Sequence, residues 1–301
     1  MSDAPVYLGI DMGGTNIRAA VVDADGTVLE SGSAQLPVAA AERATLPVEI
    51  ARSFRDRVSG VGLAVAGTVA DGVLTWSANL RLSDVDLAGS LRAATGLPVA
   101  VLNDARAAGF AEALVGAGRG APSVLSVTVG TGIGGALVVA GSLVVGMGDA
   151  GEIGHMVVDP DGPSCTCGRH GCWERFVGGR ALAEHAERVH PGHPAPLERL
   201  LADAATGEAE ATSVLSRATD MFALGLDNLH AIFAPAVVVL GGGIIARDGV
   251  VARRYLGAAA RTRWGSRSQV RRSELGDAAG LIGAALASAA SKETNQVPMA
   301  L

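Results

Sequence analysis

Residues 154–174 read GHMVVDPDGPSCTCGRHGCWE and hold all three cysteines of the chain, Cys165, Cys167 and Cys172. His155 lies ten residues before the first cysteine. One imidazole and three thiols make a complete tetrahedral ligand set for a structural zinc ion. A disulfide is a poor alternative, because the number of cysteines is odd and a Cys-x-Cys bridge is badly strained. The spacing therefore predicts a metal site rather than three unrelated buried thiols.

A second motif, DMGGTN at residues 11–16, lies between two apolar runs, 6–10 and 17–22. A tight glycine turn between two strands can bring backbone N–H groups close to phosphate oxygens, and the Thr15 hydroxyl adds a donor. Asp11 ends the first run, where its carboxylate is placed to hold a Mg²⁺ ion or its waters. Taken alone, such a turn is most often a plain hairpin.

Together the two motifs resemble the ROK family of sugar kinases, whose signature runs from Gly-His through Cys-x-Cys-Gly-x-x-Gly-Cys to Glu, as residues 154–174 do. The resemblance covers nearly the whole chain. It implies an α/β fold of two ribonuclease-H-like lobes, of the actin and hexokinase type, flanking an active-site cleft. Residues 1–117 would form the small lobe, completed by a C-terminal helix at 280–301. Residues 118–279 would form the large lobe, with the zinc-binding loop at 151–175.

A weak internal repeat agrees with two related lobes. At an offset of 117 residues, Leu8 to Val22 pairs with Leu125 to Val139, and Gly13 meets Gly130. Both segments read as strand, glycine turn and strand. Two glycine hairpins can match by chance, and the family resemblance favours a duplicated architecture.

Composition limits the class of protein. The 301 residues are 49% apolar and 18% charged, which supports a substantial core in one large or two modest domains. A net charge of −6 argues against a nucleic-acid partner. Reduced cysteines and the absence of a visible signal peptide fit a cytoplasmic protein. The uncharged span between Arg119 and Asp149 is interrupted by glycines, so two or three core strands are expected there rather than a membrane span.

Charged residues narrow the function further. Lys292 is the only lysine, which excludes a P-loop and a protein-kinase site, since both need a lysine elsewhere. The stretch from Arg253 to Arg272 holds seven arginines and no acidic residue. A solvated helix face is the plainer interpretation, and a patch near the phosphate donor is a minor hypothesis. Polyphosphate is therefore an alternative donor to ATP, disfavoured by the acidic total.

Periodicity predicts the main elements and leaves Asn79 in a loop. Strands are expected near 6–11, 17–23, 27–35, 61–65, 99–102 and 237–240, and helices near 41–58, 86–95, from 104, within 178–233 and from 280.

The resemblance also implies the site residues. Asp104 is the candidate catalytic base, although by position alone Asn103 or Asp104 would be only a helix N-cap. His155 would serve twice, with one ring nitrogen on zinc and the other N–H donating to a sugar hydroxyl. Zinc would fix the loop, and Mg²⁺ would accompany ATP. Sugar ligands would be Gly67, Asn79, Asn103, Asp104, Glu152, His155 and Glu174. Nucleotide ligands would be Asp11, Gly13, Gly14, Thr15, Asn16, Thr131, Gly132, Gly241, Gly242 and Gly243.

The expected reaction is phosphorylation of glucose, or of a close relative, at the 6-hydroxyl. An N-acetylhexosamine kinase (for N-acetylglucosamine or N-acetylmannosamine) is the alternative, since residues 76–82 only loosely resemble the sugar loop of glucokinases. Asn16 and Ala66 also depart from the family, which often has Lys and Pro there. A sugar-responsive repressor is less expected, because its helix-turn-helix extension would precede the strand that begins by Val6. A homodimer or homotetramer is expected from the family.

Overall fold

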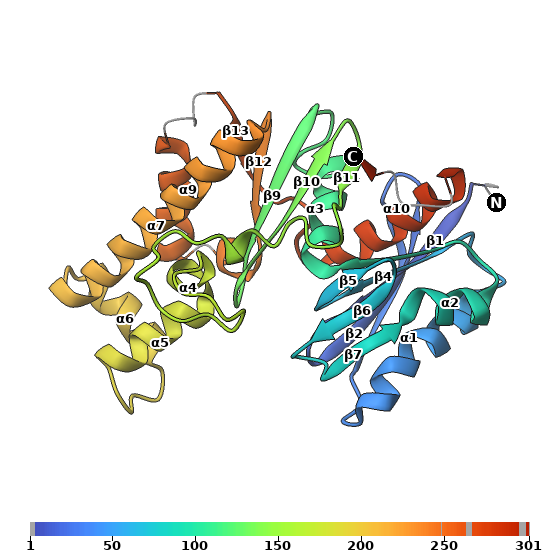
Figure 1. Ribbon diagram of the computed structural model, residues 1–301, viewed down its shortest axis with the longest axis horizontal. Helices are drawn as coiled ribbons and strands as arrows, with labels where there is room; N and C mark the ends of the chain where they lie inside the picture. Colours follow the sequence, from blue (N-terminus) through green and yellow to red (C-terminus); the bar gives the residue numbers. More distant parts are fainter. Residues whose placement is uncertain (1–3, 248, 263–266, 295–298, 301) are drawn as a thin grey trace. The chain divides into compact units, whose positions relative to one another are not determined.

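The computed structural model describes residues 4–247, 249–262, 267–294 and 299–300. The chain divides into two compact units, described here separately (Figure 1). The first unit runs to Val124 and adds Ala136–Gly151 and the chain from Glu274; the second contains Leu125–Gly135 and Glu152–Ser273. The lobes expected at 1–117 with 280–301, and at 118–279, stay a prediction. Among the described residues, no helix is long and apolar enough to cross a membrane.

A five-stranded sheet in the order β3-β2-β1-β4-β8 forms the centre of the first unit. The first three strands pair antiparallel, while β4 and β8 run parallel to β1. Strand β4 is buried along its whole length because helices cover both faces of the sheet, as its unbroken apolar sequence predicts. The strands are β1 (Val6–Met12), β2 (Asn16–Asp23), β3 (Val28–Gln35), β4 (Val61–Val65) and β8 (Val99–Asn103). The helices are α1 (Ala40–Phe54), α2 (Leu87–Thr95), α3 (Asp104–Leu114), η2 (Gly276–Ala278) and α10 (Ala279–Thr294).

A small antiparallel sheet, β5-β6-β7, lies in the connection between β4 and α2. Its strands are Thr68–Ala70, Val73–Ser77 and Leu82–Asp86, and Asn79 lies in the turn between the last two. The periodicity of the sequence predicted only a loop between residues 65 and 86. The strands are short, and the positive φ angles of Asp71, Arg81 and Asp84 interrupt the alternation that would have indicated them.

The second sheet has the order β13-β12-β9-β10-β11-β14. Read as β11-β10-β9-β12-β13, it repeats the order of the first sheet, and the predicted hairpins β1–β2 and β9–β10 hold equivalent positions. The α/β prediction of two related sheets, and that of strands between Arg119 and Asp149, are confirmed. The strands are β9 (Ser123–Val129), β10 (Ile133–Val139), β11 (Ser142–Val144), β12 (Val237–Gly241), β13 (Gln269–Arg272) and β14 (Met299–Ala300). The helices of the second unit are η1 (Ile153–His155), α4 (Glu174–Val177), α5 (Gly179–Val189), α6 (Pro196–Ala205), α7 (Ala209–Phe233), α8 (Gly243–Ala246) and α9 (Val250–Arg261).

Helix α10 lies directly on the backbone of β1 and β4, on the sheet face away from the main apolar core (Figure 1). A Cβ at Gly62 of β4 would lie 1.8 Å from the carbonyl oxygen of Ala284, and one at Gly9 of β1 would lie 2.1 Å from that of Leu281. Glycine is required at both positions because a helix backbone occupies the space of a side chain.

We therefore expect Gly62→Ala to lower the free energy of unfolding by about 3 kcal/mol, because helix and strand must separate to admit the methyl group. Urea denaturation measures the loss. Gly32→Ala in β3 is the matched control, since a Cβ there meets no atom within 4 Å. Equal stability of the two variants would contradict the close packing.

Candidate active site

The predicted catalytic residue stands at the carboxyl end of β8. Asn103 is the N-cap of α3: its Oδ1 accepts from the backbone N–H of Arg106 at 3.1 Å, and its Nδ2 donates to the carbonyl of Gly67 at 3.0 Å. Asp104 follows in the first turn, half-buried, and its Oδ1 accepts from the N–H of Ala105 at 2.9 Å. Asn103 is thus the N-cap residue, and this cap fixes the position of Asp104 as the first residue of the helix.

The loop that carries Asn79 is tied to the same edge of the sheet. The Ser77 hydroxyl donates to the carbonyl of Ala66 at 2.5 Å and accepts from the N–H of Leu80 at 3.2 Å. Arg43 of α1 donates to the carbonyl of Leu80 at 3.2 Å. Sequence reasoning missed both Ser77 and Arg43, because neither belongs to a recognisable motif.

The first glycine turn lies beside this loop. A Cβ at Gly14 would lie 3.4 Å from the Cβ of Asn79. The turn is closed by the bond from the N–H of Gly13 to the carbonyl of Asn16, at 3.0 Å, while Gly14, Thr15 and Asn16 are exposed. The structure therefore brings the turn, Asn79 and the end of β8 to one edge of the first unit.

Asp11 precedes that turn and is buried. Its Oδ2 lies 2.5 Å from Nη2 of Arg18, the residue opposite it on β2. Burial raises the pKa of the Asp11 carboxyl above its ordinary value, against the opposing charge of Arg18. The predicted nucleotide ligand is thus a buried carboxylate with a partner, at the base of the turn rather than on its surface.

The predicted metal ligands lie together in the second unit. The ligand atoms of His155, Cys165, Cys167 and Cys172 are all within 4.8 Å of one another. Sγ of Cys165 is 3.5 Å from Nδ1 of His155, and Sγ of Cys167 is 3.5 Å from Sγ of Cys172. A tetrahedral zinc ion with Zn–S bonds of about 2.3 Å and Zn–N bonds of about 2.0 Å separates its ligand atoms by roughly 3.5–3.8 Å. The four side chains therefore fit zinc.

The backbone around these cysteines explains the glycines of the motif. Gly171 has a φ of +66°, and a Cβ there would lie 1.5 Å from the carbonyl oxygen of Asp159. A short two-stranded arrangement forms where Val157 bridges to Cys172.

Burial opposes ionisation of Cys167, but hydrogen bonds from the Arg169 backbone and the Cys172 thiol outweigh it and lower the pKa of Cys167 to about 6.

Two carboxylates flank the imidazole of His155. Oε1 of Glu174 is 3.8 Å from Nδ1 and 3.3 Å from Sγ of Cys165, whereas Oε2 of Glu152 is 3.9 Å from Nε2. Nδ1 thus faces the thiols, and Nε2 faces Glu152. This arrangement suits the predicted double use of His155, with Nδ1 on the metal and Nε2 left to donate.

The second glycine turn, 130–132, connects β9 to β10 and is held by the start of α5. The N–H of Gly179 donates to the carbonyl of Gly130 at 2.8 Å, and the N–H of Arg180 donates to that of Thr131 at 3.0 Å. Next to the turn, Gly242 has a φ of +86°, and a Cβ there would lie 2.5 Å from the carbonyl oxygen of Val129. The turn and the triple glycine 241–243 are therefore neighbours.

Glu174 connects this turn with the metal cluster. A Cβ on Gly132 would lie 2.5 Å from Oε2 of Glu174, while Oε1 of the same carboxylate faces Cys165. The second unit thus gathers the metal ligands, Glu152, Glu174, the 130–132 turn and the triple glycine.

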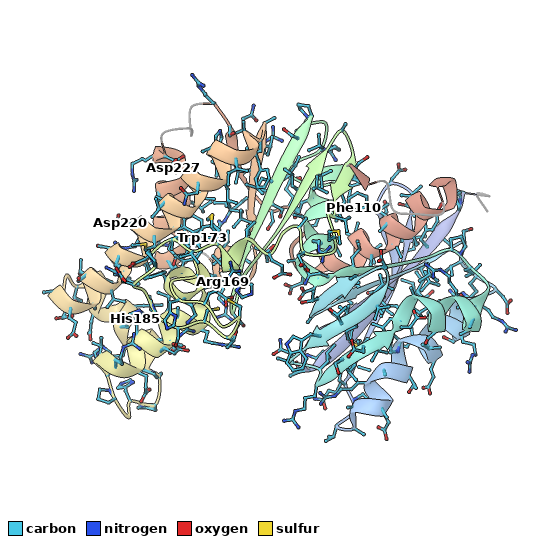
Figure 2. The ribbon with its side chains drawn as sticks, in the orientation of Figure 1. Phe110, Arg169, Trp173, His185, Asp220 and Asp227 are labelled. Carbon is cyan, nitrogen blue, oxygen red and sulfur yellow. The ribbon has the colours of Figure 1, made fainter. Side chains whose placement is uncertain are left out.

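Trp173 anchors the metal loop, a role that sequence reasoning missed (Figure 2). Its side chain is fully buried, and Nε1 donates to the carbonyl of Met221 at 2.8 Å. The indole stacks on Phe222 with 5.8 Å between ring centroids. Its place between Cys172 and Glu174 was the available signal, in a chain with only three tryptophans.

The arginine-rich stretch is partly engaged within the protein. Arg272 donates to the carbonyl of Ile245 at 2.6 Å, and Arg271 donates to Oε1 of Gln269 at 2.5 Å. Arg263 lies outside the described residues. These contacts give no support to a free anion-binding patch.

The chain belongs to the ROK family, whose sequence model matches residues 7–290. It is 34% identical over 304 residues to a glucokinase of Streptomyces coelicolor, covering 92% of this chain and 96% of that protein. It is also 34% identical over 242 residues to an N-acetylmannosamine kinase of Yersinia pseudotuberculosis, covering 79% of this chain and 82% of that protein.

Solved structures agree with this membership. The ROK hexokinase of Thermus thermophilus has a TM-score of 0.83 and 35% identity, covering 93% of this chain and 97% of its own. The ROK family glucokinase of Streptomyces griseus, in complex with glucose and AMPPNP, has a TM-score of 0.77 and 31% identity, covering 93% and 98%. The two-lobed, hexokinase-type fold predicted from the sequence is confirmed.

We expect one zinc ion per chain, and we expect Cys167→Ser to lose most of it, because a hydroxyl does not replace the thiolate. Elemental analysis of the purified protein measures the metal. The change should weaken sugar binding more than nucleotide binding, since Glu152 and Glu174 flank the cluster. Ser164→Ala, on the same loop but outside the ligand set, is the control. Metal-free native protein with full activity would contradict the structural role.

Proposed function

We propose that this protein is an ATP-dependent sugar kinase that transfers the γ-phosphoryl group to the 6-hydroxyl of glucose. The observation that carries the proposal is the likeness, over 93% of the chain, to a glucokinase with glucose and AMPPNP bound. The geometry supports it, because each unit gathers a glycine turn suited to phosphates together with polar groups suited to hydroxyls.

Asp104 is the proposed base, accepting the proton of the attacking hydroxyl. The Asn103 cap and the bond from Ala105 hold its carboxylate at the start of α3. In phosphoryl transfer the base has modest work, because positioning and charge stabilisation supply most of the catalysis. The Asn103 cap, its bond to Gly67 and the hydrogen bonds of Ser77 would therefore contribute to catalysis by positioning the base and the sugar loop.

The sugar ligands proposed are Gly67, Asn79, Asn103, Asp104, Glu152, His155 and Glu174. Carboxylates accept from hydroxyls, amides both accept and donate, and Nε2 of His155 donates when Nδ1 is on the metal. His155, Cys165, Cys167 and Cys172 would hold zinc, which supplies rigidity to the loop rather than chemistry. The loop then presents Glu152 and Glu174 in a fixed orientation.

The nucleotide ligands proposed are Asp11, Gly13, Gly14, Thr15, Asn16, Thr131, Gly132, Gly241, Gly242 and Gly243. Mg²⁺ bound with ATP neutralises charge on the phosphates. Asp11 would hold that ion or its waters from its buried position. The small and large lobes, a cytoplasmic location and assembly into a homodimer or homotetramer remain expectations from the family resemblance.

An N-acetylhexosamine kinase is the second candidate, favoured by the likeness to the N-acetylmannosamine kinase of Yersinia pseudotuberculosis. Both reactions need the same base and the same phosphate turns. They differ in whether the pocket around C2 of the sugar admits an acetamide group.

A coupled assay over a panel of hexoses, with ATP and polyphosphate as parallel donors, tests the proposal. We expect turnover with ATP and a strong preference for glucose over galactose. Inverting the 4-hydroxyl leaves a buried polar group of the site unpaired, so this discrimination should be large. Efficient turnover of an N-acetylhexosamine, with glucose a poor substrate, would favour the second candidate.

We expect Asp104→Asn to lower kcat by about 10²–10⁴ with little change in sugar affinity, because the amide keeps the shape of the carboxylate but cannot take the proton. Steady-state kinetics with glucose and ATP measure the effect. Asp25→Asn, in the exposed turn between β2 and β3, is the control and should leave kcat unchanged. Near-wild-type kcat in Asp104→Asn would falsify the assignment of the base.

A further inference from the structure

Residues 172–180 carry three of the proposed tasks within one short segment of the second unit. Cys172 belongs to the metal cluster, Glu174 flanks that cluster, and Gly179 and Arg180 hold the 130–132 turn through their backbone N–H groups. The four-residue helix α4 joins the two ends of the segment. Helix α4 therefore connects the metal cluster to the 130–132 turn.

Two buried aromatic residues hold the two ends of α4. Trp173 immediately precedes the helix and is anchored to Met221, as described above. At the other end, the hydroxyl of Tyr255 on α9 donates to the carbonyl of Val177, the last residue of α4, at 2.9 Å. The Tyr255 ring is 1% exposed and stacks on Phe222, with 4.3 Å between centroids and 8° between planes.

There is little room between Val177 and the glycine turn. A Cβ added to Gly178 would lie 2.9 Å from the carbonyl oxygen of Thr131 and 3.1 Å from Cα of Gly132. The next residue, Gly179, already donates to Gly130. The space beside Gly178 is too small for one methyl group, so a shift at the end of α4 presses on the turn.

We propose that Tyr255 is a positioning residue for the nucleotide: its hydroxyl fixes the end of α4 and thereby the 130–132 turn. The inference rests on the proposed function, because it takes that turn as a phosphate-binding element. Tyr255 itself touches neither substrate. Loss of its hydroxyl should weaken nucleotide binding and leave metal binding unchanged, since Trp173 separately anchors the end of the segment next to the metal cluster.

Tyr255→Phe tests the proposal, because it removes one hydroxyl and keeps the ring that stacks on Phe222. We expect the KM for ATP and the Kd for the non-hydrolysable analogue AMPPNP to rise about three- to tenfold, the effect of losing one hydrogen bond. The KM for glucose and the zinc content should stay close to wild type. Tyr7→Phe, at the only other tyrosine of the chain and in the other unit, is the matched control.

The Kd for AMPPNP, measured by calorimetry, separates this inference from the proposed function. If the wild-type protein binds AMPPNP but does not phosphorylate glucose, the proposed function fails while the comparison of Kd values still decides the role of Tyr255. An unchanged Kd in Tyr255→Phe, or an equal rise in the KM for glucose, would overturn the proposal. If Tyr255→Phe does not fold, Gly178→Ala is the second variant, because its methyl group would press on the carbonyl of Thr131. An unchanged Kd for AMPPNP in Gly178→Ala would overturn the proposal as well.

Discussion

The parallel pairing of β1, β4 and β8 is the constraint on which the site residues of the first unit depend. Carboxyl ends of parallel strands meet at one edge of a sheet, so the segments that follow them must lie together. The glycine turn follows β1, the Gly67 loop follows β4, and the Asn103 cap follows β8. Residues far apart in the sequence thus become neighbours, and a side-chain hydrogen bond from Asn103 to Gly67 fixes two of these segments to each other. Helix α10 stabilises this pairing by packing on the strands with no side chain between.

In the second unit, the site residues depend on the metal cluster and on the aromatic stack around Trp173. The loop from Glu152 to Cys172 contains little regular structure beyond η1, and its backbone is held by local hydrogen bonds such as that from the N–H of Val158 to the carbonyl of Gly171 at 2.9 Å. The four ligands would order the loop at one point when they hold an ion, and the buried indole of Trp173 orders it at a second point. Glu174 lies between these points and contacts the glycine turn, so its carboxylate has little freedom. Such preorganisation lowers the entropy lost when a sugar binds.

Much of this could be read from the sequence, for reasons that are physical. The end of a strand at Asn103 and the start of a helix at Asp104 could be predicted, because a buried apolar run is followed there by a capping residue. The metal site follows because thiols are rare and their spacing is informative. The β5–β7 sheet was not predicted, since its strands are short and residues with positive φ angles interrupt their alternation. The roles of Ser77, Arg43 and Tyr255 were not predictable, because each depends on a backbone carbonyl that only the folded chain brings into reach.

The shared strand order of the two sheets also distinguishes the elements that both units contain from those that only one unit contains. In both repeats, the hairpin β1–β2 or β9–β10 carries one of the glycine turns proposed above to bind phosphate. The parts with no counterpart in the other half, namely the β5–β7 sheet and the metal loop, are insertions in the crossovers between strands. After a duplication, such insertions can diverge as long as they keep their contacts to the two turns, namely Asn79 beside Gly14 and the backbone bonds from Gly179 and Arg180 to the 130–132 turn. A scaffold of this kind can therefore change its acceptor molecule by loop replacement while its donor chemistry stays the same.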